Sequence, residues 1–122
     1  MSNMAWKEYN FWVYILFDEK GAGTYIGVTN DLERRIIEHK MGLVKGFSKD
    51  KRLNKLGYCE WHQYIDQALA REKAIKKWER AWKYRLIESV NPEWKDLMED
   101  LDDYIKNFTP FELEDALSRY KK

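Results

Sequence analysis

The feature that most constrains the fold is the segment FWVYILF at residues 11–17. It is almost continuously apolar and aromatic, which is typical of a strand covered on both faces. The polar stretch DEKGAG follows at 18–23, and TYIGV at 24–28 again has the composition of a strand. Two such segments joined by a glycine-containing turn predict an antiparallel hairpin. The chain is therefore expected to fold around a β-sheet.

A helix is expected directly after this hairpin. Asn30 and Glu33 have the spacing of a capping box, which predicts a helix that begins there and runs through about Met41. Gly42 and Gly46 bracket the end of this helix, and the polar, basic segment GFSKDKRLNK at 46–55 is expected to form a loop. Residues 56–63 (LGYCEWHQ) then predict a third strand.

The second half of the chain reads as helical. Apolar residues recur at helical spacing from residue 66 to residue 90, which predicts one long helix that ends before Asn91-Pro92. Thr109 followed by Pro110 marks the start of a further helix near the C-terminus. The apolar positions expected to face the core in the long helix are Leu69, Ile75, Trp78, Trp82 and Leu86.

Length and composition bound the class of protein. A chain of 122 residues is expected to form one domain with a modest core. Its single cysteine, Cys59, excludes an internal disulfide and fits a reducing compartment. Neither a signal-peptide pattern at the N-terminus nor an apolar run of membrane-spanning length is present, so a cytoplasmic protein without membrane attachment is expected.

The net charge of +1 conceals an uneven distribution of charge. Residues 33–55 hold eight Lys/Arg and three Asp/Glu, and residues 71–85 hold seven and two, so each segment carries +5. Residues 86–122 hold five and ten, which gives −5. Two basic segments and an acidic tail fit a polyanion-binding face, but solvated charge on long helices explains the pattern equally well.

Helical periodicity separates the two arginines of the segment NDLERRIIEHK at 30–40. At about 100° per residue, Arg35 and His39 flank the stripe formed by Leu32 and Ile36, while Arg34 lies on the opposite side. Arg35 and His39 are thus expected next to the sheet and Arg34 in water. On spacing alone, packing of the arginine stem and a satisfied boundary histidine explain this better than a binding site.

The tyrosines of the expected hairpin follow the period of a strand. Tyr14 and Tyr25 can lie side by side across the two strands, with Gly27 leaving bare backbone beside them. A strand glycine often marks the close approach of a ligand or of another chain. A cross-strand aromatic pair, which contributes up to about 1 kcal/mol without any function, is the simpler explanation.

Two glutamates of the expected long helix lie at the margin of its apolar stripe. Glu72 and Glu79 have similar helical angles, so spacing does not choose between them. Lys76 and Lys83 each follow one of them by four residues, and such pairs are ordinarily exposed ion pairs. None of the common metal or phosphate motifs (HExxH, paired CxxC, P-loop, GxGxxG) occurs in the chain.

Taken together, these segments resemble the GIY-YIG nuclease superfamily. Trp12-Val13-Tyr14 and Tyr25-Ile26-Gly27, with eleven residues from tyrosine to tyrosine, are similar to its two half-motifs. The NDLERRIIEHK helix, a strand ending in EWH, the segment AREKAIKKW and the segment NPEW follow in the family's order. The resemblance covers about residues 10–97 and is strongest to small stand-alone bacterial members, akin to the N-terminal catalytic domain of excinuclease C.

The resemblance implies an α+β fold, in which helices flank a three-stranded antiparallel sheet, and an endonuclease that hydrolyses DNA phosphodiester bonds with one divalent metal, Mg²⁺ or Mn²⁺. A role in DNA repair or recombination is a further expectation. The implied site residues are the tyrosines Tyr14 and Tyr25, the motif glycine Gly27, the phosphate-binding Arg35, the neighbouring His39, the metal ligand Glu72, and Asn91 as a phosphate-positioning residue. Tyr14 and His39 are alternatives for the general base, with Tyr14 preferred.

DNA is the expected partner, and five basic residues are candidates for its backbone: Lys45, Lys49, Lys51, Arg52 and Lys76. Residues 98–122 form an acidic helical extension, expected to cover the back of the domain or to mediate association with a protein partner or a second copy. A catalytically weak nucleic-acid-binding module of the same fold is the alternative function.

Overall fold

The computed structural model describes residues 10–18, 23–44, 53–99 and 101. In chain order the elements are β1 (Phe11–Phe17), β2 (Thr24–Thr29), α2 (Leu32–Lys40), β3 (Lys55–His62), α3 (Ile65–Lys77) and α4 (Arg80–Val90). Both β2 and β3 pair antiparallel with β1, so that the sheet order is β2-β1-β3. The expected α+β class and three-stranded antiparallel sheet are confirmed.

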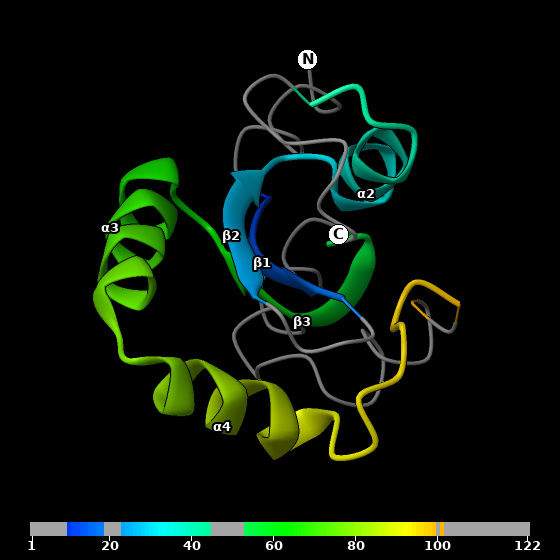
Figure 1. The fold of residues 1–122 in the computed structure, drawn as a ribbon. Coiled ribbons are helices and arrows are strands. Elements are labelled where there is room, and N and C mark those ends of the chain that lie inside the picture. The colour runs from blue at the N-terminus through cyan, green and yellow to red at the C-terminus, as the bar shows by residue number, and fades with distance from the viewer. Residues whose placement is uncertain (1–9, 19–22, 45–52, 100, 102–122) are drawn as a thin grey trace, which may run out of the picture.

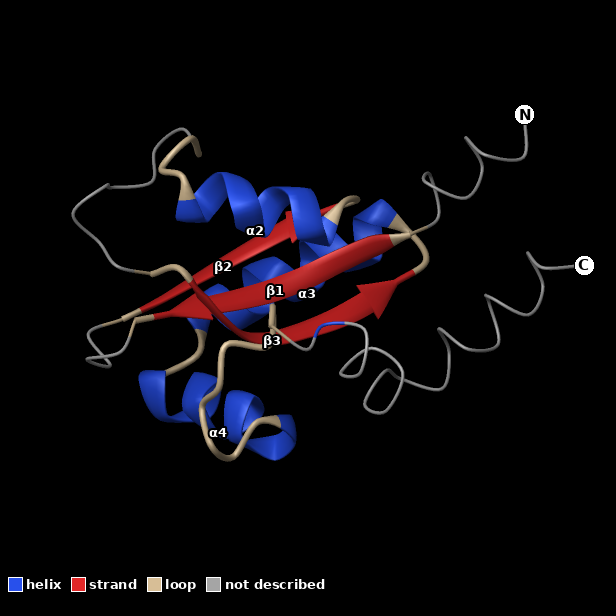
Figure 2. Cartoon of the chain, turned by 90° about the vertical axis from the view of Figure 1, so that its right-hand side faces the viewer, coloured by secondary structure: helices blue, strands red, loops and turns tan. Residues whose placement is uncertain are grey.

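The side chains of β1 alternate between two cores, as the apolar composition of this central strand predicts. On one face, α2 covers the sheet, and on the other face lie α3 and α4 (Figures 1 and 2). Burial of an aliphatic side chain in such a core stabilises the fold by about 1.5–3 kcal/mol. The α2 side buries Trp12, Tyr14, Leu16, Leu32 and Ile36, and the other side buries Val13, Ile15, Ala68, Ile75 and Ile87.

The helix α2 begins one residue later than predicted. Its N-cap is Asp31, whose side chain accepts a hydrogen bond from the backbone N–H of Arg34 at 3.3 Å, whereas Asn30 is exposed. The reason is the exit from β2, where the Thr29 hydroxyl bonds both the backbone N–H and the carbonyl of Asp31. These bonds place Asp31 at the start of the first helical turn, so the capping box proposed for Asn30 and Glu33 is wrong.

The single long helix predicted for residues 66–90 is also wrong. Trp78 and Glu79 adopt extended backbone angles and separate α3 from α4. An unbroken helix of 25 residues would be about 37 Å long, whereas an eight-residue strand spans only about 26 Å. The break lets both helices pack on one sheet. Leu69 and Trp82, predicted to face the core, are 43% and 57% exposed, and Ala68 occupies the buried position instead.

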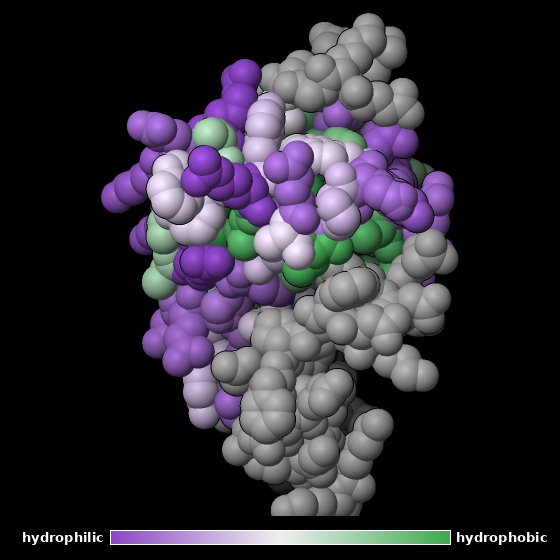
Figure 3. Space-filling view, turned by 90° about the horizontal axis from the view of Figure 1, so that it is seen from below, coloured by the Kyte–Doolittle hydropathy of each residue, from purple (hydrophilic) through white to green (hydrophobic). Residues whose placement is uncertain are grey.

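Only a short stripe of α4 faces the core. Ile87 is its buried residue, and the side of the molecule seen from below is mainly hydrophilic, with a smaller hydrophobic area at its centre (Figure 3). Within the described residues, no helix has the length and apolar character needed to cross a membrane.

The segment after α4 returns to the α2 side of the sheet. The backbone N–H of Leu97 donates to the carbonyl of Leu56 at 2.8 Å, and Met98 and Leu101 pack against the core on that side. Part of the segment assigned to an extension therefore lies on the domain. The helix predicted at Thr109 lies outside the described residues.

Candidate active site

Tyr14 lies at the centre of the site and is 1% exposed. It stands opposite Gly27 in the β1–β2 register, and its ring extends over that glycine. A Cβ atom at Gly27 would lie 2.4 Å from the Tyr14 hydroxyl oxygen, which no real side chain tolerates. The bare backbone predicted at Gly27 is therefore covered by the tyrosine itself.

Tyr25 lies beside Tyr14, as predicted. The two ring centroids are 6.2 Å apart with an interplanar angle of 33°. In the register Tyr25 stands opposite Leu16, two residues along from the Tyr14–Gly27 pair, so the two tyrosines are diagonal neighbours. The half-buried Tyr25 also contacts the edge of the His39 ring, with a centroid distance of 4.8 Å.

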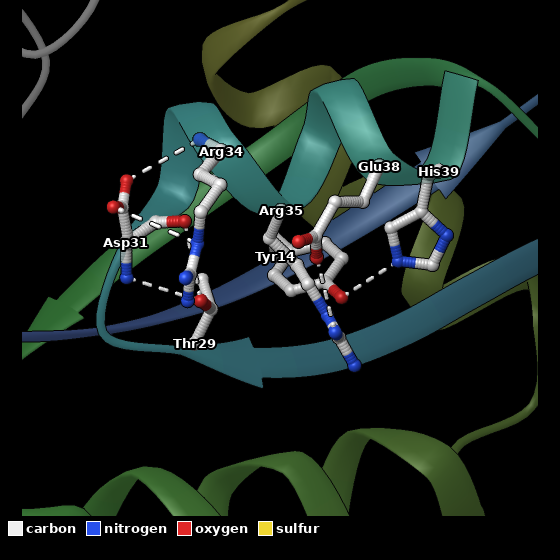
Figure 4. Close-up of polar contacts among 7 residues, drawn as sticks. All are labelled: Tyr14, Thr29, Asp31, Arg34, Arg35, Glu38 and His39. Carbon is white, nitrogen blue, oxygen red and sulfur yellow. Dashed lines mark hydrogen bonds and ion pairs between the residues drawn. The ribbon is translucent and has the colours of Figure 1, made fainter. Parts of the chain in front are cut away.

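His39 connects α2 to Tyr14. Its Nε2 atom lies 2.9 Å from the Tyr14 hydroxyl, and the side chain is buried (Figure 4). Burial, with the nearby charge of Arg35, lowers the pKa of His39 to about 4, and burial together with Tyr25 raises the pKa of Tyr14. At neutral pH the imidazole is thus uncharged and the phenol protonated, and in the tautomer that carries the ring proton on Nδ1 the Tyr14 hydroxyl donates to Nε2.

Arg35 lies one turn before His39 and extends past the Tyr14 hydroxyl (Figure 4). Its charge lowers the Tyr14 pKa, which opposes the larger effect of burial. Nη1 bonds the Glu38 carboxylate at 3.3 Å, whereas Nε is buried and has no hydrogen-bond partner among the described residues. Arg34, by contrast, is exposed, as the helical angles predict.

Glu72 approaches the same site from α3. Its side chain is 17% exposed, and its negative charge adds to the rise of the Tyr14 pKa, although burial is the main cause. Its carboxylate pairs with Lys76 at 3.3 Å. Glu79 is exposed at the break between α3 and α4, so the structure distinguishes the two glutamates that spacing left equal.

A metal would have few protein ligands at this site. Among the described residues, no three His, Cys, Asp or Glu side chains form a cluster able to hold an ion. Mg²⁺ commonly binds through one or two carboxylates together with substrate phosphate oxygens and water. The single half-buried carboxylate of Glu72, whose charge acts on Tyr14, fits that mode of binding.

Asn91 has a different position. It is the C-cap of α4 and is buried, and its amide bonds backbone groups of the described residues: it donates to the carbonyls of Gly57 and Lys95 and accepts from the Lys95 N–H. These contacts fix the chain where it leaves α4. The structure thus gives Asn91 a structural role, and its role at a phosphate stays a prediction.

Of the predicted DNA contacts, only Lys76 is described. It is exposed on α3 and paired with Glu72. The other four, Lys45, Lys49, Lys51 and Arg52, lie outside the described residues.

A pocket of about 520 Å³ lies at the end of β1, away from Tyr14. Trp94 in its wall has a positive φ of 56° and contacts the rings of Phe17 and Tyr84 edge-on. None of the predicted catalytic residues is among its described lining: Phe17, Asp18, Lys55, Tyr84, Trp94, Lys95, Asp96 and Glu99.

Sequence reasoning missed one group near the site. Arg71, next to Glu72, is bonded to the buried Glu60 of β3. The sequence does contain a signal for this contact: Tyr58, Glu60 and His62 occupy alternate positions of a strand and so lie on one face of the sheet. When a helix covers such a face, its polar side chains need hydrogen-bond partners.

A known protein family matches the region of the chain that contains this site. Residues 10–85 match the GIY-YIG catalytic domain, which is more than half of the chain. The chain belongs to the GIY-YIG family. The matched region contains both tyrosines, Gly27, Arg35, His39 and Glu72, whereas Asn91 lies beyond it. The family is one of nucleases, so the resemblance seen in the sequence is confirmed.

Several bacterial relatives are similar over most of their own length. A UPF0213 protein of Staphylococcus saprophyticus is 36% identical over 76 residues, which cover 62% of this chain and 92% of the relative. A UPF0213 protein of Clostridium perfringens is 38% identical over 78 residues, 64% of this chain and 83% of the relative. The solution NMR structure of a UPF0213 protein from Bacillus halodurans matches with a TM-score of 0.46 at 25% identity, covering 71% of this chain and 92% of that one.

Proposed function

We propose that this protein is a divalent-metal-dependent endonuclease that hydrolyses DNA phosphodiester bonds. The observation that carries the proposal is the 2.9 Å contact between the Tyr14 hydroxyl and a neutral His39, with the Arg35 guanidinium beside it. The nuclease family supports the reaction class.

Arg35 would bind the scissile phosphate. A phosphodiester is anionic and gathers further negative charge in its transition state, so it needs a fixed positive group. The buried Nε of Arg35, which has no partner among the described residues, fits a phosphate oxygen, and the planar fork of the guanidinium matches two. Loss of one such donor typically lowers the rate by about 10²–10³-fold.

Glu72 would hold the metal. A bound Mg²⁺ or Mn²⁺ supplies charge stabilisation at the phosphoryl or leaving oxygen. Glu72 would be the protein ligand of this ion, and water and substrate oxygens would supply its other ligands.

Tyr14 and His39 would act in series on the attacking water. The raised pKa of Tyr14 makes a free tyrosinate rare at neutral pH, so the phenol alone is a poor base. In the tautomer in which Nε2 of His39 accepts from Tyr14, the Tyr14 oxygen would take a proton from water while it passes its own to the imidazole. A bound phosphate would offset the Arg35 charge that helps to lower the His39 pKa.

The test is nicking of supercoiled plasmid DNA in Mg²⁺ or Mn²⁺ by the wild type and by Tyr14→Phe. The phenyl ring still fills the space above Gly27, so only the hydroxyl is lost, and the rate should fall by about 10²–10³-fold. Tyr64→Phe, at an exposed tyrosine, is the matched control and should cut normally. Equal rates for Tyr14→Phe and the wild type would refute the assigned role of the hydroxyl.

The basic surface of α3 and α4 supports the second candidate, a nucleic-acid-binding module with weak catalysis. Its exposed members include Lys73, Lys76, Lys77 and Arg80. Such a module would bind DNA with an affinity that falls steeply with salt but would leave the plasmid intact in either metal. Measured binding without cleavage by the wild type would favour this function over the nuclease.

A further inference from the structure

The strand β3 and the helix α3 share a buried charged contact outside the tyrosine site. Glu60 is 7% exposed, and its carboxylate accepts hydrogen bonds from Nε of Arg71 at 2.9 and 3.1 Å. The Tyr58 hydroxyl donates to the same carboxylate at 2.8 Å, and Nε2 of His62 lies 2.5 Å from it. The guanidinium of Arg71 also stacks over the ring of Trp78 at 5.2 Å. We call the Glu60–Arg71 contact the clasp.

The apolar packing of α3 is too thin to fix its rotation. Its buried residues are Ala68 and Ile75, one of them a small side chain. Its N-cap, Tyr64, makes no side-chain capping bond, and Leu69 is 43% exposed. Apolar contact is not directional, so a two-residue stripe leaves the angle of the helix about its own axis weakly determined.

The clasp and Glu72 lie on opposite sides of that stripe. At about 100° per residue, Arg71 lies about 60° to one side of Ala68, and Glu72 lies about 40° to the other. Arg71 bonds to β3, which is one edge of the sheet, and Glu72 lies on the side of the stripe turned away from β3, toward the other edge strand, β2, over which the Tyr14 ring extends. A directional bond on the β3 side therefore sets the direction of the carboxylate on the other side.

We propose that Arg71 is a positioning residue that, through the clasp, holds Glu72 at the angle required to bind the metal next to Tyr14 and Arg35. The kinetic part of this inference rests on the proposed nuclease function. Displacement of a catalytic group by about 1 Å can cost about 100-fold in rate. Residues that orient metal ligands typically change metal affinity or activity by about 10–100-fold.

The test compares Arg71→Lys with Arg85→Lys in the full chain. Lysine keeps the charge but lacks both Nε and the planar group that stacks on Trp78. Arg85 lies over Trp82 at 5.5 Å in a similar stacked pair, but both residues are exposed. Nicking rates are measured against Mn²⁺ concentration. Arg71→Lys should raise the Mn²⁺ concentration for half-maximal rate by about 10-fold or more, and Arg85→Lys should leave it unchanged.

A second variant and a second readout separate the possible failures. Glu60→Gln should shift the Mn²⁺ requirement in the same direction, and the double variant should show less than the sum of the two shifts. Mn²⁺ broadening of the amide NMR signals around Glu72, recorded without DNA, should weaken in Arg71→Lys even if no plasmid is cut. If folded Arg71→Lys shows the same signal broadening and the same Mn²⁺ requirement as the wild type, the positioning role of Arg71 is overturned. A wild type that shows the broadening but cuts no DNA would instead refute the nuclease.

Discussion

At the scale of single residues, Gly27 is required because the ring of Tyr14 occupies the place of a side chain. In Gly27→Ala the new Cβ would meet both the hydroxyl oxygen and the attached ring carbon, at 2.4 and 2.5 Å. Tyr14 must then move away from His39. We expect a loss of about 1–3 kcal/mol in the free energy of unfolding, measured by urea denaturation, together with a loss of nicking.

Gly23→Ala is the matched control for that experiment. Among the described residues a Cβ at Gly23 would meet no atom within 4 Å, so this variant should keep its stability and its nicking. Wild-type stability in Gly27→Ala would contradict the close contact with Tyr14.

The buried His39 predicts a pH dependence of stability. Its pKa is about 4 in the folded protein, against about 6.5 in an unfolded chain. Between these values only the unfolded chain takes up the proton, so the unfolding free energy should fall as pH is lowered, by up to about 3 kcal/mol. Urea denaturation at pH values from about 7.5 to about 4.5 measures this fall.

The variant His39→Gln should lose most of that slope, whereas His62→Gln should keep it because His39 is still present. An unchanged slope in His39→Gln would show that another group causes the pH dependence.

Residue periodicity predicted some of these contacts and missed others. The angles of one helix were enough to place Arg35 and His39 toward the sheet and Arg34 in water. They could not show that Tyr14 lies over Gly27, because that depends on the register of two strands and on the direction of the ring. Arg71 was missed for a similar reason, since its partner Glu60 lies on a different element.

At the scale of elements, Asp96 joins the end of α2 to the start of β3. One carboxylate oxygen accepts from the backbone N–H groups of Leu56 and Met98, and the other bonds Nζ of Lys40 at 2.6 Å. Asp96→Ala should lower the unfolding free energy by about 1–3 kcal/mol, because backbone donors lose their partner. Glu93→Ala, which removes an exposed ion pair with Lys95, should cost less than about 1 kcal/mol.

The pH dependence of the Asp96 contribution has a definite sign. Burial raises its pKa, but the bonds from Lys40 and the two backbone groups outweigh burial and hold the pKa below its ordinary value. The stabilisation is therefore complete above the ordinary pKa of about 3.9 and is lost as pH falls through the lower folded value. As pH is lowered through this acidic range, the difference in unfolding free energy between the wild type and Asp96→Ala, measured by chemical denaturation, should become smaller.

Elements were predictable where the pattern was strong and local. Both strands of the hairpin and the third strand were confirmed to within about one residue. The break between α3 and α4 was not predictable, because Trp78 and Glu79 include neither glycine nor proline. Burial of Trp78 against the sheet, and the limited length of that sheet, end α3 at this point. Tertiary packing thus decided what helical propensity left open.

At the scale of the whole molecule, the site forms where two helices on opposite faces of the sheet meet the β2 edge. Tyr14, Arg35 and His39 lie on the α2 side (Figure 4), and Glu72 lies on α3, from which its charge acts on Tyr14. These residues lie on separate elements, so residue spacing within one segment could not group them as a site. The resemblance to the family is what predicted the group. The exposed lysines Lys73, Lys76 and Lys77 place positive charge on the helix that carries Glu72.

The most direct test of the account is the metal dependence of plasmid nicking by wild type, Glu72→Gln and Glu79→Gln. Glutamine keeps the shape of glutamate but removes the charge that binds the ion, and Glu79 is the exposed control. We predict nicking by the wild type and by Glu79→Gln in Mg²⁺ or Mn²⁺, its loss on chelation, and a fall of at least about 100-fold in Glu72→Gln. Nicking by Glu72→Gln at the wild-type rate would contradict the assignment of the metal site.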